Sequence, residues 1–323
     1  MSNVATVAGA KSAGRARIAD YAPTYGALAA LVLLLVMNSV FTPNFFDVNN
    51  FRNILLQVAP TVLVAVGMTL VIATGGIDLS VGSVMAIASA VAATQLDRGA
   101  GLAVLLALAV ATGAGAFNGA LISGFGIQPI IVTLALLISG RGIAQVISRG
   151  GQLIPFENPS FEYLGKGVVA GVPVQVIVML LAVAFAFFLM RATAFGRYVV
   201  AVGGNEAAAR LAGIKIHRTK ITVYALSGLL AGLAGLIATA RLGASDAQKV
   251  GLNIELDAIA ATVVGGTPLT GGRATVLGTL VGALIMQVIT TGFVMNGISY
   301  SWSLVIKAAI IIIAVYIQRP KVA

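Results

Sequence analysis

Long apolar segments dominate this chain and restrict it to one broad class of fold. Of its 323 residues, 59% are hydrophobic and only 9% are charged, whereas soluble domains carry about 25% charged residues. About 20 apolar residues cross a lipid bilayer as a helix. Polar and Gly/Pro breaks divide the sequence into ten candidate spans: 24–41, 52–74, 80–95, 102–123, 129–148, 173–191, 218–241, 255–265, 274–295 and 300–318. We therefore expect an all-α, polytopic transmembrane helical bundle with about ten spans.

Two of these segments, 80–95 and 255–265, are short for a membrane span. Short or broken spans are tolerated where neighbouring helices bury them or where they line a cavity. In an eight-span alternative, each short segment merges with a neighbour. Both versions predict a tail over 1–23, a transmembrane domain over 24–318 and a second tail over 319–323.

The distribution of basic residues predicts the orientation in the membrane. If the N-terminus is inside and the spans alternate, most Lys and Arg residues fall inside: Lys11, Arg15, Arg17, Arg191, Arg197, Arg210, Lys215, Arg218, Lys220, Arg273, Arg319 and Lys321. Fewer fall outside: Arg52, Arg98, Arg141, Arg149, Lys166, Arg241 and Lys249. Cytoplasmic loops carry such an excess of Lys and Arg. The net charge of +10 therefore indicates a multi-pass inner-membrane protein with both termini in the cytoplasm, and not nucleic-acid binding.

Residues 192–220 form the one long polar and basic break, and they contain a short helix whose two ends are marked. Asn205 is a good N-cap, because its side-chain oxygen can accept a free backbone N–H. Glu206 in the first turn and Arg210 near the last match the helix dipole. Gly213 can adopt the left-handed conformation that ends a helix. We expect this capped cytosolic helix to dock a partner protein.

A glycine-rich pattern, G-G-x-x-L-[S/T]-x-G, occurs twice between apolar runs. It covers residues 75–82 (GGIDLSVG) and 265–272 (GGTPLTGG). Glycine permits tight turns and close backbone approach. The two segments are either similar turns or a pair of broken-helix elements that line or move a pathway. Three further glycine pairs at four-residue spacing, 115/119, 228/232 and 278/282, predict close helix packing.

Two charged residues lie close to or within apolar segments. A carboxylate at the bilayer centre costs about 2.5–3.5 kcal/mol on insertion scales, so it needs a partner or water. We place Asp78 instead at a helix start, where backbone N–H groups stabilise negative charge. Lys307 lies within the last apolar segment, where it either extends its ammonium to the membrane surface or pairs with an acid.

The sequence contains none of the patterns that would indicate an enzyme. It has no cysteine, no H-E-x-x-H motif and no G-x-x-x-x-G-K-[S/T] nucleotide loop. Its interior polar residues are mostly uncharged: Asn38, Thr61, Thr69, Thr74, Ser83, Ser89, Asn118, Gln128, Gln145, Gln287 and Thr290. Such groups pair helices with one another, and together they suit a neutral, hydroxyl-rich solute. We expect a transport protein without a metal or cofactor of its own.

Three motifs in order resemble the permease subunits of ribose-type ABC importers of monosaccharides. They are 75–83 (GGIDLSVGS), 205–214 (NEAAARLAGI), and 264–272 (VGGTPLTGG) followed by 278–282 (GTLVG). The resemblance covers essentially residues 25–317. It implies the type II importer fold, similar to that of vitamin B12 importers. Branched-chain amino-acid permeases are a related alternative, although the first motif looks like the sugar branch.

The resemblance also implies partners and residue roles. A second permease subunit, identical or related, is expected alongside two P-loop ATPase subunits, which would carry ATP and Mg²⁺, and a periplasmic sugar-binding protein. The residues expected to couple to the ATPase are Asn205, Glu206, Ala207, Ala208, Arg210 and Gly213. The residues expected in the substrate pathway or its gates are Gly75, Gly76, Asp78, Ser80, Asn118, Gly265, Gly266 and Thr267. The outer charges Arg149, Lys166, Arg241 and Lys249 are either solvated or face the binding protein.

The main alternative is a secondary carrier or channel that moves a small neutral solute without an ATPase. It predicts transport that does not need residues 204–213. A membrane scaffold that transports nothing is a third class, but a scaffold has no need for glycine-broken spans.

Overall fold

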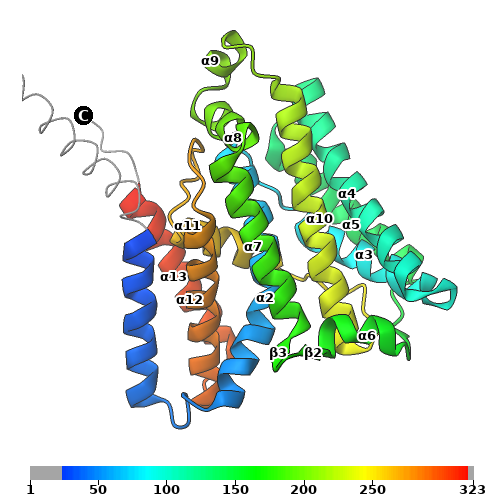
Figure 1. Cartoon of the computed structure of the whole chain (residues 1–323), viewed down its shortest axis with the longest axis vertical. Helices are drawn as coiled ribbons and strands as arrows, with labels where there is room; N and C mark the ends of the chain where they lie inside the picture. The colour runs from blue at the N-terminus through cyan, green and yellow to red at the C-terminus, as the bar shows by residue number, and fades with distance from the viewer. Residues whose placement is uncertain (1–23, 319–323) are drawn as a thin grey trace, which may run out of the picture.

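The apolar segments predicted from the sequence are helices in the computed structural model, which describes residues 24–318 (Figure 1). Within that range, seven helices are long and apolar enough to cross a membrane: Thr24–Phe41, α2 (Val48–Ala73), α4 (Ala100–Phe125), α5 (Pro129–Ile147), α7 (Val174–Ala192), α10 (Ile216–Leu242) and α12 (Val276–Met295). Three more complete the predicted set: α3 (Val81–Gln95), α11 (Ile254–Val264) and α13 (Tyr300–Gln318). The prediction of a polytopic helical bundle is confirmed. The predicted tails, 1–23 and 319–323, lie outside the described residues.

The two short segments form helices of their own, each separated from its long neighbour by a loop. α3 has 15 residues and α11 has 11. Residues 74–80, here named the first glycine loop, separate α2 from α3. Residues 265–275, the second glycine loop, separate α11 from α12. Glycine lowers helix propensity and permits sharp turns, which explains why both breaks fall on the repeated pattern.

The remaining elements lie at the two ends of the bundle. At one end, named the α9 end, are α8 (Ala194–Gly204) and α9 (Glu206–Leu211) (Figure 1). At the opposite end, the α6 end, are α6 (Pro159–Lys166) and the hairpin of β2 (Val168–Val169) and β3 (Val172–Pro173). Two connections also pair as strands, β1 (Ile154–Pro155) antiparallel to β4 (Ala244–Ser245), and η1 (Leu96–Arg98) joins α3 to α4. The sequence analysis predicted none of these two-residue strands, because segments so short leave no alternating pattern.

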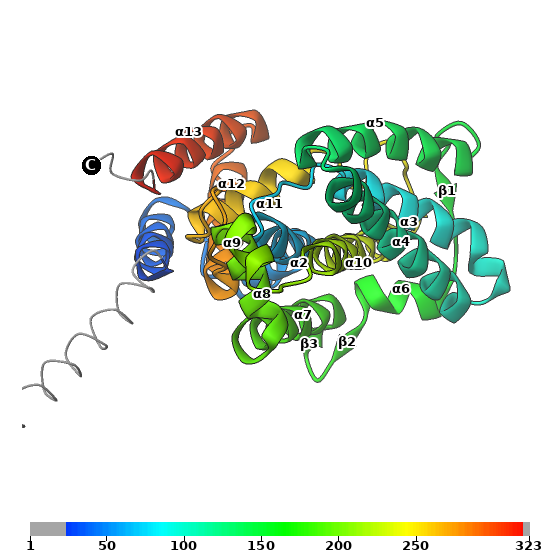
Figure 2. The ribbon, with the colours of Figure 1, turned by 90° about the horizontal axis from the view of Figure 1, so that it is seen from above.

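The core is organised around α2 and α10, the two most deeply buried long helices. Figure 2 shows them in the middle, with α3, α4 and α5 to one side and α11, α12 and α13 to the other. Glycines bring α4 and α10 into close contact, as their spacing predicted. A Cβ atom added to Gly115 would collide with the Tyr224 carbonyl oxygen, and one added to Gly119 would lie 2.7 Å from the Cα of Ile221. Close approach of this kind stabilises helix pairs in lipid.

Large apolar side chains cover the outside of the bundle. Examples are Leu33 on the first helix, Leu105 on α4, Ile138 on α5, Leu181 on α7 and Ile312 on α13, all exposed. Apolar surface of this extent is not stable in water. The protein is therefore a multi-pass membrane protein whose outer helices face lipid.

Candidate functional site

The short helix α9 has the two caps that the sequence predicted. The Oδ1 atom of Asn205 accepts a hydrogen bond from the backbone N–H of Ala208 at 2.9 Å. At the other end, the N–H of Ile214 donates to the carbonyl of Ala209, and Gly213 has a φ of +79°. This pattern is a Schellman motif, which satisfies the last carbonyl groups of a helix. The caps define α9 although it has only six residues.

One side chain of α9 binds the helix to α10, and most of the others are exposed. The carboxylate of Glu206 accepts a hydrogen bond from Lys220 Nζ of α10 at 2.7 Å and lies 3.5 Å from Arg210. This ion pair fixes α9 to the start of α10. Ala207, Ala208, Arg210, Leu211 and Gly213 are exposed. The structure therefore brings the predicted coupling residues together on one protruding surface.

Beneath α9, contacts between backbones join α8 to the end of α2 and to the second glycine loop, and they join the second glycine loop to the first. A Cβ added to Gly203 would collide with the carbonyl oxygen of Ala73 and lie 2.6 Å from the backbone nitrogen of Gly272. A Cβ added to Gly271 would lie 2.8 Å from the nitrogen of Gly75 and 3.0 Å from the oxygen of Gly203. The N–H of Gly272 donates to the Ala73 carbonyl at 3.0 Å. We name this contact, formed by Gly75, Gly203, Gly271 and Gly272, the glycine junction.

Only part of the glycine junction was predicted. Gly75 was among the nominated pathway residues, whereas Gly203 was not. The signal that could have identified Gly203 is the Gly203-Gly204 pair directly before the cap Asn205, because glycine pairs permit close backbone contact. Gly76 lies next to the junction, and a Cβ there would lie 2.5 Å from the Tyr224 hydroxyl oxygen.

Asp78 lies in the first glycine loop, two residues before the N-cap of α3, and is buried. Its Oδ1 accepts hydrogen bonds from the backbone N–H and the hydroxyl of Ser80, at 3.0 and 2.6 Å. Its Oδ2 accepts from the hydroxyl of Ser227 in α10 at 2.9 Å. Asn118 of α4 donates to the Ser80 hydroxyl at 3.0 Å. Asp78 is thus at a helix start, as predicted, and its side chain also joins α3 to α10, a link that the sequence did not reveal.

The second glycine loop is stabilised by hydroxyl groups. Thr267 and Thr275 share a hydrogen bond of 2.7 Å, and Thr275 donates to the carbonyl of Gly265 at 2.9 Å. Gly265 packs directly on the backbone of Gly278 in α12, while Gly266 adopts a φ of +94°. The nominated pathway residues therefore gather at the two glycine loops, with Asn118 reaching the first loop from α4, and all of them except the exposed Gly75 are buried. Their role in a pathway stays a prediction.

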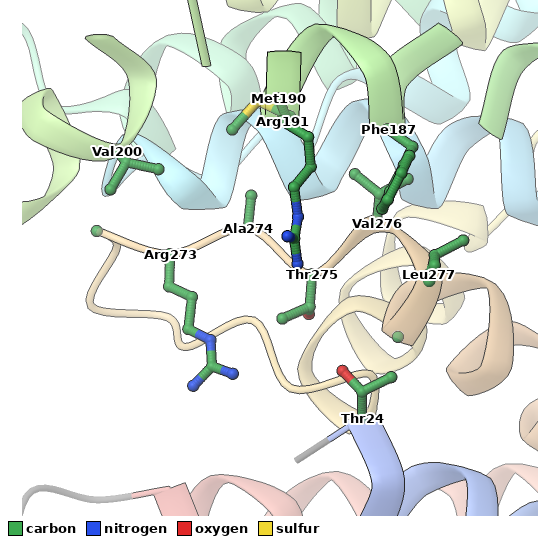
Figure 3. A pocket seen from close by; sticks show the side chains of 12 residues that line it. Thr24, Phe187, Met190, Arg191, Val200, Arg273, Ala274, Thr275, Val276 and Leu277 are labelled. Carbon is green, nitrogen blue, oxygen red and sulfur yellow. The ribbon is translucent and has the colours of Figure 1, made fainter. Parts of the chain in front are cut away.

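A cavity of about 380 Å³ opens at the α9 end, beside the second glycine loop (Figure 3). Arg191 from the end of α7 and Arg273 from the loop line it, together with the apolar Phe187 and Val276. In Figure 3, Arg191 extends toward Thr275, while Arg273 points away from it. The charged groups among its described lining residues are both cations, so this lining disfavours a cationic solute.

A larger cavity of about 640 Å³ opens at the α6 end, between α2, α10 and α11. Its lining includes Thr61, Arg241, Asp246, Lys249 and Asp257. Lys307 of α13 donates to Asp257 at 3.0 Å, which identifies the acid that pairs with this buried lysine. Of these lining charges, the sequence analysis had named Arg241 and Lys249, and only as outer charges.

Comparison with known proteins agrees with this architecture. Residues 50–315 match the family described as branched-chain amino acid transport system / permease component. The chain belongs to this family. It is therefore a transport component of an import system and not an enzyme. No solved structure matches the chain.

Individual relatives of this permease extend over nearly its whole length. It is 42% identical over 299 residues to the ribose import permease protein RbsC of Escherichia coli strain K12, covering 91% of this chain and 93% of the relative. It is 42% identical to the galactofuranose transporter permease protein YtfT of the same strain, covering 91% and 89%. It is 37% identical to the fructose import permease protein FruF of Bifidobacterium longum, covering 91% and 87%.

Proposed function

We propose that this permease passes a monosaccharide of the pentose or hexose class inward across the bacterial inner membrane. The observation that carries the proposal is the similarity to relatives named for ribose, galactofuranose and fructose, at 42%, 42% and 37% identity over 91% of the chain. The family description names branched-chain amino acids. We follow the individual relatives, because their similarity covers both chains almost completely.

In this proposal the α9 end faces the cytoplasm. Five basic residues lie on α8, on α9, at the start of α10 or just before it: Arg197, Arg210, Lys215, Arg218 and Lys220. An excess of Lys and Arg marks cytoplasmic segments. The α6 end then faces the periplasm, where a sugar-binding protein delivers the substrate. Both chain termini are assigned to the cytoplasmic side.

A separate P-loop ATPase, which carries ATP and Mg²⁺, is proposed to dock on α9. Leu211 is 91% exposed, on a helix that protrudes beyond the membrane-spanning segments. An apolar side chain in that position favours burial against a partner. The exposed guanidinium of Arg210 beside it adds a hydrogen-bond donor for an acidic partner residue. A second permease subunit, identical or related, completes the assembly.

The glycine junction supplies a physical route from the ATPase to the membrane helices. Gly203 and Gly204 lie just before Asn205, the N-cap of α9. The backbone of Gly203 contacts Ala73 at the end of α2 and Gly272 in the second glycine loop, and Gly271 of that loop contacts Gly75 of the first. A displacement of α9 therefore acts on the starts of α3 and α12 together. Because packed interfaces switch between discrete arrangements, and because ATP favours one arrangement through differential affinity, such a displacement can alternate access to the pathway.

Charge reversal at Glu206 tests the coupling role of α9. In Glu206→Lys, the attraction between Glu206 and Lys220 becomes a repulsion between two lysines. We therefore expect a permease that inserts into the membrane but does not take up sugar, while its ATPase partner still hydrolyses ATP. The measurement is sugar uptake and ATPase activity of the whole complex in proteoliposomes. Glu162→Lys is the matched control, because Glu162 also forms an ion pair with a lysine, Lys166, but lies on α6. Equal loss of uptake in the control would contradict a specific role for α9.

Gly213→Val tests the same role through the backbone. A β-branched residue at a φ of +79° is strained by about 1–3 kcal/mol, which removes the cap of α9. We expect the same uncoupling as for Glu206→Lys. Gly150→Val is the control, since Gly150 has a φ of +89° in open surroundings away from α9. Unchanged uptake and unchanged sugar-stimulated ATPase activity in both the Glu206 and Gly213 variants would refute the coupling proposal.

Purification of the tagged permease in mild detergent, with mass spectrometry of the proteins that accompany it, tests the proposed assembly. We expect a stoichiometric P-loop ATPase, and the same experiment distinguishes a homodimer from a heterodimer of permeases. A permease that is free of ATPase and still transports sugar in liposomes would support the secondary-carrier alternative instead.

A further inference from the structure

The cavity at the α6 end has a balanced set of charges. Arg241 at the end of α10 and Lys249 in the following loop are cationic, and Asp246 and Asp257 are anionic. Each carboxylate has a lysine close by, Asp246 with Lys249 at 4.0 Å and Asp257 with Lys307 of α13 at 3.0 Å, so neither is an uncompensated charge that would select a cation. A neutral solute is the class of ligand that such a lining suits.

Several lining groups retain hydrogen-bonding capacity. Asp257 receives Lys307 through Oδ1, which leaves its Oδ2 without a hydrogen bond in the described structure. Arg241 donates through Nη1 to the carbonyl of Leu56 at 3.0 Å, which leaves Nη2 available. The hydroxyl of Thr61 has no partner among the described residues.

The free groups include both donors and acceptors. A carboxylate oxygen accepts only, a guanidinium donates only, and a hydroxyl does both. A polyhydroxylated molecule needs this mixture, because each of its hydroxyl groups loses water on binding and must recover a donor and an acceptor. The volume of about 640 Å³ lies within the range of about 300–1,000 Å³ that is typical of small-molecule sites.

The inner side of the cavity is closed by residues of the loop between α10 and α11. Arg141 of α5 donates from Nη1 to the carbonyl groups of Ala247 and Val250, at 2.9 and 2.7 Å. The next residue, Gly251, packs directly on the backbone of Gly82 in the first turn of α3. The cavity therefore ends against the start of α3, which the first glycine loop connects to the glycine junction.

We propose that this cavity is the site that accepts the sugar from the periplasmic side, with Thr61, Arg241 and Asp257 binding its hydroxyl groups. The proposal rests on the proposed monosaccharide import and assigns a binding site within it. The loop held by Arg141 is the floor that keeps the accepted sugar from passing further in this conformation.

The absence of cysteine from the chain permits a direct test by thiol labelling. Thr61→Cys is introduced into the full chain, assembled with its ATPase in right-side-out membrane vesicles. A membrane-impermeant maleimide then reports access from the periplasmic side. We expect labelling of this variant, and we expect D-ribose at about ten times its dissociation constant to slow that labelling about tenfold, because bound ligand excludes the reagent. Sucrose at the same concentration controls for osmotic effects.

Two further variants make the test specific. Gln57→Cys is a second reporter, since Gln57 also lines the cavity and is exposed; it serves if Thr61→Cys does not assemble. Ser160→Cys is the matched control on α6, exposed at the same end but outside the cavity lining. We expect the control to be labelled at the same rate with and without ribose.

Uptake of ribose by the same vesicles, with the binding protein added, separates this proposal from the proposed function. Protection of Thr61→Cys or Gln57→Cys without any uptake would support the sugar site and overturn the import role. Uptake without protection of either reporter, or equal protection of Ser160→Cys, would overturn the site and leave the import role standing.

Discussion

The first glycine loop holds a buried carboxylate, whereas the second, built on the same residue pattern, is stabilised by neutral hydroxyl groups. Asp78 accepts three hydrogen bonds in the first loop. The corresponding position in the second loop is Pro268, and the hydrogen bonds there run between Thr267, Thr275 and the carbonyl of Gly265. The two loops nevertheless meet each other at the glycine junction.

The glycines of the pattern also differ in conformation between the loops. In the first loop Gly75 has the positive φ, of +79°, and Gly82 lies inside α3. In the second loop Gly266 and Gly272 have positive φ values, of +94° and +76°, while Gly265 does not. The shared pattern therefore specifies close backbone contact, and the side chains between the glycines determine how each loop is held.

The largest effect is expected from breaking the contact between the loops. In Gly203→Val, the new side chain would collide with the Ala73 carbonyl and the Gly272 nitrogen, which are backbone atoms that cannot rotate away. Overpacking of this kind typically costs about 1–3 kcal/mol and sometimes more. We expect a lower midpoint of thermal unfolding in detergent and loss of sugar uptake.

Gly204→Ala, at the next position in the chain, is the control for Gly203→Val. A Cβ at Gly204 would lie 4.0 Å from the Cα of Gly272, which is an ordinary contact. We expect its unfolding midpoint and its uptake to stay close to those of the parent protein. If Gly203→Val behaved like Gly204→Ala, the two loops would not depend on close contact at α8.

Removing the carboxylate from the first loop is expected to have the next largest effect. Asp78→Leu leaves the N–H and hydroxyl of Ser80 and the hydroxyl of Ser227 buried without their acceptor. Each group left unsatisfied costs about 1–3 kcal/mol, so we expect a clear fall in the thermal midpoint. Asp78→Asn keeps one acceptor oxygen and should lose much less. Equal midpoints for the two variants would mean that the carboxylate does not hold α3 to α10.

The sequence predicted those features of the site that depend on neighbouring residues. The caps of α9 at Asn205 and Gly213, the breaks at both glycine loops and the close packing at Gly115 all follow from residues within a few positions of one another. Hydrophobic length likewise located the ten helices to within a few residues. Such local features can be predicted from the sequence, because caps and hydrophobic periodicity depend on residues within one or two helical turns.

Contacts between distant segments could not be predicted in this way. Ser227 is 149 residues from Asp78, and Asp257 is 50 residues from Lys307. From the sequence alone, Asp78 and Lys307 could each have had many partners. Only the packing of α3, α10, α11 and α13 determines which residue lies within hydrogen-bonding distance. The cavity at the α6 end was not foreseen for the same reason: its walls come from four helices and two loops.

The smallest effect in this comparison is expected in the second loop. Thr267→Val keeps the shape of the side chain but removes a hydroxyl that donates to Thr275 Oγ1 and accepts from the Thr275 N–H at 3.0 Å. Neutral hydrogen bonds contribute about 1 kcal/mol each, so the thermal midpoint should fall less than in Asp78→Leu. Thr112→Val is the control, because the Thr112 hydroxyl bonds only within α4, to the carbonyl of Leu108. A larger loss for Thr267→Val than for Asp78→Leu would reverse the comparison, since it would make the neutral loop the one whose hydrogen bonds the bundle depends on most.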